Sequence, residues 1–217
     1  MKQQHIPLAR EGYPFIALSG FITFILALTG PVALAFAGLV ITLFVVYFFR
    51  DPSRIPPDNP EAILSPADGR VILIKEIDDE RFLKKKALKI SIFMNVFNVH
   101  VNRIPLTGTV EDISFKPGRF YSADKDKAAL HNEYSAVTLT TTAGIRYCVV
   151  QVAGLIARRI VCRAEKGDTI KSGERYGLIR FGSRLDLYLP PGTRTNVQLR
   201  DKVRAGETIL AYLKDRA

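Results

Sequence analysis

The sequence predicts a mainly β fold, a barrel-sandwich-hybrid-like domain of short strands, preceded by an N-terminal α-helical membrane hairpin. Three features predict it: an uncharged stretch between Glu11 and Arg50, a series of short apolar runs separated by turn signals, and a repeated turn-and-strand unit. The chain has 217 residues. The part of the chain after the hairpin is long enough for one domain with a substantial core.

The uncharged stretch predicts two helices. As one helix, rising about 1.5 Å per residue, it would be nearly twice as long as a bilayer core of about 30 Å is thick. Gly30-Pro31 at its midpoint divides it into the arms Pro14–Thr29 and Val32–Phe49. A shallow re-entrant pair is one alternative. A signal peptide ending near Ala33-Leu34-Ala35 is a weaker one, because the apolar run continues past that point.

Charge gives the expected location and partner. Lys2 and Arg10 precede the hairpin, and Arg50 and Arg54 follow it, so the positive-inside tendency keeps both ends and the following domain cytoplasmic, at the cytoplasmic membrane. The net charge of +10 indicates an anionic partner, and lipid headgroups are within reach of a tethered chain. Nucleic acid is not expected, because no helix-turn-helix, RNP-like or zinc-binding pattern is present.

The expected division of the chain is a hairpin with its connector over residues 1–55 and a β-rich catalytic domain over 56–217. The proline-rich connector Asp51–Pro60 cannot continue a helix. Strands are then predicted at Arg70–Ile74, Ala87–Met94, Asn98–Ile104, Gly108–Phe115, Ala136–Thr141, Ile145–Ala153, Arg158–Ala164, Gly177–Leu189 and Thr208–Leu213.

The repeat consists of Gly167–Glu174 and Arg200–Glu207. Such units look like those of lipoyl- or biotinyl-type modules, which suggests the hybrid architecture by analogy. Neither copy offers a carrier lysine at a hairpin tip, so a swinging arm is not expected. Cys148 and Cys162 lie in apolar runs without metal-ligand spacing, which predicts reduced core residues and no metal site, with a disulfide as the alternative.

The Gly182-Ser183 bond lies in the strand-like run Tyr176–Pro190. Alternate residues of this run fall on opposite sides, and one of the two sides is apolar except at Ser183. In one interpretation the hydroxyl bonds a neighbouring carbonyl and Gly182 marks a bulge. In the other, the hydroxyl attacks the Gly182 carbonyl in an N-to-O acyl shift. Elimination then splits the chain and leaves a pyruvoyl group at the new amino terminus.

An acyl shift needs a base and a group that orients it. The chain has three histidines, of which His5 is in the amino-terminal tail and His131 in a polar segment expected to be a solvated loop. His100 stands in the apolar run Phe97–Pro105, where a satisfied, half-buried histidine is the alternative to a base. Asp68 lies in Leu64–Val71, where Asp-Gly ordinarily makes a turn; a place near an arriving lipid headgroup is the functional interpretation.

A hairpin followed in order by SPADG, NVHVNRIP, QVAGLIARRIV and YGLIRFGSRLDLYLP closely resembles the short form of phosphatidylserine decarboxylase over nearly the whole chain. The resemblance implies self-cleavage between Gly182 and Ser183, a pyruvoyl group derived from Ser183, and a maturation triad of Ser183, His100 and Asp68. It implies a large and a small chain that remain a heterodimer, with a higher oligomer left open, acting on a phospholipid without a metal or diffusible cofactor. The candidates for headgroup or phosphate contacts are Asn102, Asn132, Glu133, Arg158 and Arg159.

The longer relatives differ at two places. They carry LGST where this chain has FGSR, and a second histidine where this chain has Arg103, so the group that protonates the product carbanion stays open between His100 and a water that it holds. For the two candidate arginines a solvated face, and for Asn132-Glu133 an ordinary polar loop, are the alternatives.

Two other functions remain open from sequence. An archaetidylserine decarboxylase acting on ether lipids would share every residue discussed. A non-enzymatic, membrane-tethered β-sandwich adaptor would use Gly182-Ser183 only as a bulge; the repeat favours it, and the lack of coiled-coil heptads disfavours it.

Overall fold

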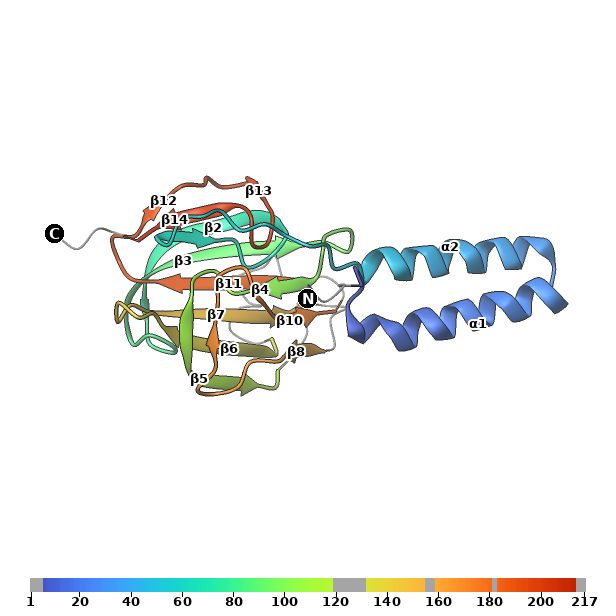
Figure 1. Ribbon diagram of the computed structural model, residues 1–217, viewed down its shortest axis with the longest axis horizontal. Coiled ribbons are helices and arrows are strands. Elements are labelled where there is room, and N and C mark those ends of the chain that lie inside the picture. The colour runs from blue at the N-terminus through green and yellow to red at the C-terminus, as the bar shows by residue number, and fades with distance from the viewer. Residues whose placement is uncertain (1–5, 119–131, 155–158, 181–182, 214–217) are drawn as a thin grey trace. The chain divides into compact units, whose positions relative to one another are not determined.

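The computed structural model describes residues 6–118, 132–154, 159–180 and 183–213. The chain divides into two compact units, Met1–Ser53 and Arg54–Ala217. The first is a helical hairpin and the second is built of β-strands (Figure 1). The prediction of a mainly β fold that follows a helical N-terminal segment is confirmed.

The hairpin consists of a 3-10 turn η1 (Arg10–Gly12) and the helices α1 (Tyr13–Thr29) and α2 (Val32–Phe48), each within one residue of its predicted bounds. Most of their large apolar side chains are exposed. The hydroxyls of Thr23 and Thr42 join the two helices at 3.0 Å, and a Cβ on Gly38 would lie 2.9 Å from the Thr23 hydroxyl. The segment Arg10–Thr29 is long and apolar enough to cross a membrane, whereas α2 is shorter.

The β unit contains one large and two small sheets. The large sheet has the order β13-β2-β3-β11-β7-β6-β5-β9, and the labelled strands from β2 to β5 follow one another in Figure 1. Its strands are β2 (Gly69–Asp79), β3 (Lys85–Met94), β5 (Gly108–Lys116), β6 (Tyr134–Thr140), β7 (Arg146–Ala153), β9 (Thr169–Ile170), β11 (Ser183–Leu189) and β13 (Lys202–Val203). The small sheets have the orders β4-β10-β8 and β1-β14-β12. Their strands are β1 (Ala62–Leu64), β4 (Val101–Arg103), β8 (Ile160–Cys162), β10 (Arg175–Ile179), β12 (Arg194–Thr195) and β14 (Ile209–Tyr212).

The main hydrophobic core lies on one face of the large sheet. It takes residues from β3, β11 and β7 as well as from the small sheets, for example Ile92, Leu185, Val149 and Ile179. A smaller cluster lies on the opposite face, where the ring of Phe82 packs edge-on against Tyr188. Both faces of β11 are therefore buried, which explains why no residue of this strand is exposed.

The sequence repeat is a structural repeat. In one copy the N–H of Val110 donates to the carbonyl of Asp168 at 2.8 Å, and in the other the N–H of Val71 donates to the carbonyl of Asp201 at 3.0 Å. Gly173 and Gly206 both have positive φ, at +78° and +73°, a conformation that glycine adopts without steric cost. The strand order of the large sheet is consistent with this relation, since β13 and β9 end it symmetrically about the β11-β7 pair.

Two predicted strands differ from the structure. The run Gly177–Leu189 is not one strand, because Ile179 ends β10 in a small sheet and Ser183 begins β11 in the large sheet. The strand predicted at Asn98–Ile104 is restricted to β4, so His100 lies in the loop directly before it. Alternating sequence patterns identified the extended segments, but they do not show where the chain passes from one sheet to another.

Candidate active site

Ser183 is the first residue of β11 and is fully buried. Its hydroxyl has no hydrogen-bond partner among the residues that the structure describes, so the bond to a neighbouring carbonyl that the alternative interpretation requires is not observed there. Gly182 lies outside the described residues. A buried hydroxyl without a partner costs about 1–3 kcal/mol, and such groups in native structures call for an explanation such as catalysis.

Ser183 belongs to a row of residues across the large sheet. Its cross-strand partners are Met94 in β3 and Ala153 in β7. The N–H of Ala153 donates to the carbonyl of Glu133 at 2.9 Å, which places Glu133 next in the row. Directly opposed residues of antiparallel strands point to the same face. Met94 and Ala153 belong to the main core, so this row, hereafter the Ser183 row, is directed toward that core.

The small sheet β4-β10-β8 adjoins the Ser183 row. The N–H of Ile179 donates to the carbonyl of His100 at 3.3 Å, and Ile179 pairs with Ile160 in β8. The N–H of Ile160 in turn bonds the carboxyl of Glu133. His100 and Glu133 are thus connected to opposite sides of the end of β10.

Two buried amides link the sheets beside Ser183. The side-chain N–H of Gln151, two residues before Ala153, donates to the amide oxygen of Asn102 at 2.9 Å. The Asn102 amide nitrogen lies 3.7 Å from the sulfur of Met94. Asn102 therefore lies next to the row that contains Ser183. Gln151 was not among the predicted site residues; its polar side chain in an apolar strand was the only signal.

His100 is fully buried, and its tautomer follows from its partner. Nδ1 lies 2.9 Å from the carbonyl oxygen of Asn98. Because a carbonyl only accepts, Nδ1 carries the proton and donates, and Nε2 carries the lone pair. The turn is fixed by the bond from the N–H of Asn95 to the side-chain oxygen of Asn98 at 2.9 Å. The ring is therefore held in the form that suits a base.

Asp68 is held by two groups that the sequence patterns did not indicate. One carboxylate oxygen accepts the N–H of Ala205 at 2.7 Å, and the other accepts from the Arg54 guanidinium at 2.8 Å. Arg54 also donates to Glu207 at 3.0 Å. Asp68 and Glu207 lie far apart in the sequence, so only the fold brings them to the same guanidinium.

The structural repeat separates two roles of Asp68. Thr107 occupies the equivalent place in the other copy, where its hydroxyl accepts the N–H of Ser172 at 3.0 Å. In that copy the Thr107 hydroxyl therefore accepts the turn N–H that the Asp68 carboxylate accepts from Ala205 in this one. The feature particular to Asp68 is its charge and the ion pair with Arg54.

The remaining candidates lie in different surroundings. Asn132 is buried, and its amide donates to the carbonyl of Ala153 at 2.7 Å. A side chain in an ordinary polar loop would instead be exposed to solvent. Burial raises the pKa of the Glu133 carboxyl, although the N–H of Ile160 opposes the shift. Arg159 is exposed, as a solvated face predicts. Arg158 lies outside the described residues.

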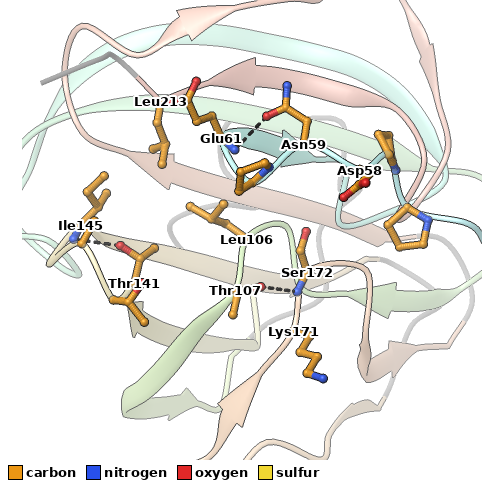
Figure 2. Close-up of a pocket in the computed structure, with 15 residues that line it drawn as sticks. Asp58, Asn59, Glu61, Leu106, Thr107, Thr141, Ile145, Lys171, Ser172 and Leu213 are labelled. Atoms are coloured by element: carbon orange, nitrogen blue, oxygen red, sulfur yellow. Dashed lines mark hydrogen bonds between the residues drawn. The ribbon is translucent and has the colours of Figure 1, made fainter.

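A pocket of about 1160 Å³ lies elsewhere in the β unit (Figure 2). It is lined partly by Thr107, Ser172 and Ile145. Ile145 directly precedes β7, whereas Ser183 pairs with the last residue of that strand. At about 3.3 Å per residue the two places are about 25 Å apart. The pocket is therefore separate from the Ser183 row.

A buried serine hydroxyl at the start of a strand and a buried histidine in the loop before the adjoining small sheet are groups expected of a class of protein in which serine acts as an intramolecular nucleophile. Comparison with known proteins agrees with this class. Residues 41–211 match the family model of phosphatidylserine decarboxylase. The chain belongs to the phosphatidylserine decarboxylase family.

Similarity to members of this family extends over the whole chain. This chain is 55% identical over 213 residues to a phosphatidylserine decarboxylase proenzyme of Desulfotalea psychrophila, and the match covers 98% of this chain and 100% of the relative. It is 52% identical over 213 residues to that of Geotalea uraniireducens, with the same coverage. The proenzyme of Burkholderia mallei is 46% identical over 215 residues, covering 99% of each chain.

Proposed function

We propose that this chain is a precursor that cleaves itself between Gly182 and Ser183 and then decarboxylates phosphatidylserine to phosphatidylethanolamine. The observation that carries the proposal is the buried Ser183 hydroxyl, which makes no hydrogen bond within the described part of the chain. Family membership supports an enzyme of this type, and the comparisons favour neither the ether-lipid enzyme nor the adaptor.

Cleavage begins when His100 Nε2 takes the proton of the Ser183 hydroxyl. The oxygen attacks the Gly182 carbonyl carbon, the bond to the Ser183 nitrogen breaks, and an ester forms. Removal of the Cα proton expels the Gly182 carboxylate and leaves dehydroalanine. Water then replaces the nitrogen, which leaves as ammonia, and a pyruvoyl group remains on the small chain.

The new chain end is held from the opposite face of the sheet. The Arg184 guanidinium donates to Asp186 at 2.5 Å and to the Ser91 hydroxyl at 3.0 Å. Lys89 pairs with Asp186 at 2.9 Å. These residues are all buried. Because Ser91 and Lys89 belong to β3 in the large chain, this cluster supports a heterodimer in which the small chain stays clamped after cleavage.

A pyruvoyl group derived from Ser183 would supply an electron sink, a ketone beside an amide, for the amine of the serine headgroup and for the electron pair released with CO2. The surrounding residues suit this group. Ala153, opposite Ser183, is the smallest side chain of the row, so it occupies the least room beside the new end group. Asn102, Asn132 and Glu133 provide amide and carboxyl groups for the headgroup.

The hairpin supports a location at the cytoplasmic membrane with the β unit on the cytoplasmic side. At the end of α2 the Arg50 guanidinium lies 3.9 Å from the centre of the Tyr47 ring and donates to the Tyr47 carbonyl at 2.8 Å. Tyrosine and arginine are typical anchors at the membrane surface. The segment Arg10–Thr29 would supply the apolar span.

The test is the intact mass of the purified chain under denaturing conditions. The wild type is expected to give two fragments, the smaller beginning at residue 183 with a keto group in place of its amine. Ser183→Ala should remain one chain, and His100→Ala should cleave slowly or not at all. Ser135→Ala, a buried serine in the row that contains Gln151, is the matched control and should cleave normally. Normal cleavage of Ser183→Ala would refute the proposal.

A further inference from the structure

Glu133 is the ionisable side chain of the Ser183 row. Ser183 pairs with Ala153, and Ala153 bonds Glu133, so the serine and the glutamate are separated by one strand whose residue there is alanine. Neighbouring strands lie about 4.8 Å apart, which puts the two backbones about 10 Å apart. Three carbon–carbon bonds of about 1.5 Å give the glutamate carboxyl a reach of roughly 4 Å from its backbone, which is enough to extend over Ala153.

That distance fits a reacting headgroup. When the substrate amine is joined to the former Cα of Ser183, the carbon that loses CO2 lies two bonds away, about 2.5 Å. With the Glu133 carboxyl at this full reach, roughly 3 Å remains between it and that carbon, within the range for proton transfer between heavy atoms. A larger residue at position 153 would fill the same space.

The environment of Glu133 suits an acid. One carboxyl oxygen is bonded by the N–H of Ile160, which orients the group. Burial raises the pKa of this carboxyl and so favours the protonated form. The residue is only partly buried, in contrast to His100, so water can return a proton after each turnover.

His100 has the complementary properties. Its Nδ1 proton is committed to the Asn98 carbonyl, so the ring presents a lone pair at Nε2. This arrangement suits removal of the Ser183 hydroxyl proton.

We propose that Glu133, and not His100, is the acid that protonates the substrate carbon after CO2 has left. The inference rests on the proposed function. The pair of electrons released by C–C cleavage takes the carboxyl proton of Glu133, and the resulting carboxylate regains a proton from water. The redox state of the enzyme does not change.

The test compares Glu133→Gln with the wild type and with Glu80→Gln, an exposed glutamate in the β2–β3 loop. All three are expected to cleave and to carry the keto group by intact mass. Glu133→Gln should lose about 10²–10⁴-fold in kcat, with KM little changed, because glutamine keeps the size and hydrogen-bonding capacity of the side chain. Glu133→Asp, which retains the acid one carbon further away, should recover part of the loss.

A second measurement does not depend on rate. If the proton reaches the former Ser183 carbon instead of the substrate carbon, the end group becomes alanine; its nitrogen comes from the substrate amine, and water supplies the oxygen of the released aldehyde. After incubation with phosphatidylserine, Glu133→Gln should show more amino-terminal alanine by sequencing than the wild type at equal turnover. A structural role would not change this ratio.

Three results overturn the inference. They are unchanged kcat in Glu133→Gln, an unchanged alanine fraction, and arrested cleavage in both Glu133→Gln and Glu133→Asp, which would assign the carboxyl to maturation. These outcomes differ from failure of the proposed function, in which the wild type itself lacks the keto group or does not release CO2 from phosphatidylserine.

Discussion

Replacement of Asp68 by threonine tests the two roles that the structural repeat separates. Thr107 shows that a hydroxyl can accept the turn N–H in the other copy. Asp68→Thr should therefore keep the bond to Ala205 and lose only the ion pair with Arg54. Asp68→Ala loses both contacts. The ion pair is nearly buried, with side-chain exposures of 9% for Arg54 and 12% for Asp68. Water therefore screens the attraction between the two charges only weakly, and its loss should cost more free energy than the loss of a surface pair.

The magnitudes come from these contacts. Breaking a buried ion pair costs about 3–5 kcal/mol, and Glu207 still holds Arg54, so we expect about 3 kcal/mol for Asp68→Ala. Threonine should recover about 1 kcal/mol through the turn bond. At roughly 2–4 °C per kcal/mol for a domain of this size, Tm should fall by about 6–12 °C for alanine and by about 2–4 °C less for threonine.

The assay is thermal unfolding in detergent, with both substitutions made in the Ser183→Ala chain so that every sample is uncleaved. Cleavage is followed separately in chains that keep Ser183. Equal Tm values for Asp68→Thr and Asp68→Ala would refute the equivalence of Asp68 and Thr107. Threonine that restores stability without restoring cleavage would show that maturation needs the charge of Asp68.

Two further predictions concern stability. Burial raises the pKa of Asp186, but the charges of Arg184 and Lys89 more than offset it and hold the pKa below its usual value; its stabilisation is therefore complete above the unfolded value of about 3.9 and is lost as pH falls below it. In the uncleaved chain, Tm should fall more steeply as pH drops below about 4 than it does in Asp186→Asn, and parallel curves would contradict this. Gly173→Ala should destabilise more than Gly144→Ala in chemical denaturation: both glycines have positive φ, but a Cβ at Gly173 would lie 2.5 Å from Pro56, whereas nothing lies within 4 Å at Gly144. Equal losses would mean that the contact with Pro56 has no energetic effect.

Sequence patterns predicted the features that depend on local chemistry. The uncharged stretch and Gly30-Pro31 located both helices to within a residue, because apolar length and a helix-terminating pair act locally. The repeat predicted equivalent turns, because positive φ at Gly173 and Gly206 requires glycine. The Gly182-Ser183 bond was singled out by one hydroxyl in an apolar alternation.

Features that depend on distant parts of the chain were not predicted. Arg54 as the partner of Asp68, and Gln151 beside Asn102, arise from pairings across 14 and 49 positions in the sequence. The break between β10 and β11 was missed because both strands are apolar and alternate in phase. A one-dimensional pattern records which residues avoid water, but not which sheet they join.

The sequence by itself determined the hairpin, the mainly β composition, the repeat and the serine at which the chain is proposed to split, since each depends on residue types over short distances. The tertiary structure alone decided which groups meet that serine. Strand register places Met94, Ala153 and Glu133 in one row with Ser183, and the loop before β4 fixes the His100 tautomer. Register and sheet packing are set by the burial of side chains distant in sequence, so the chemistry of the site appears only when the sheets are assembled.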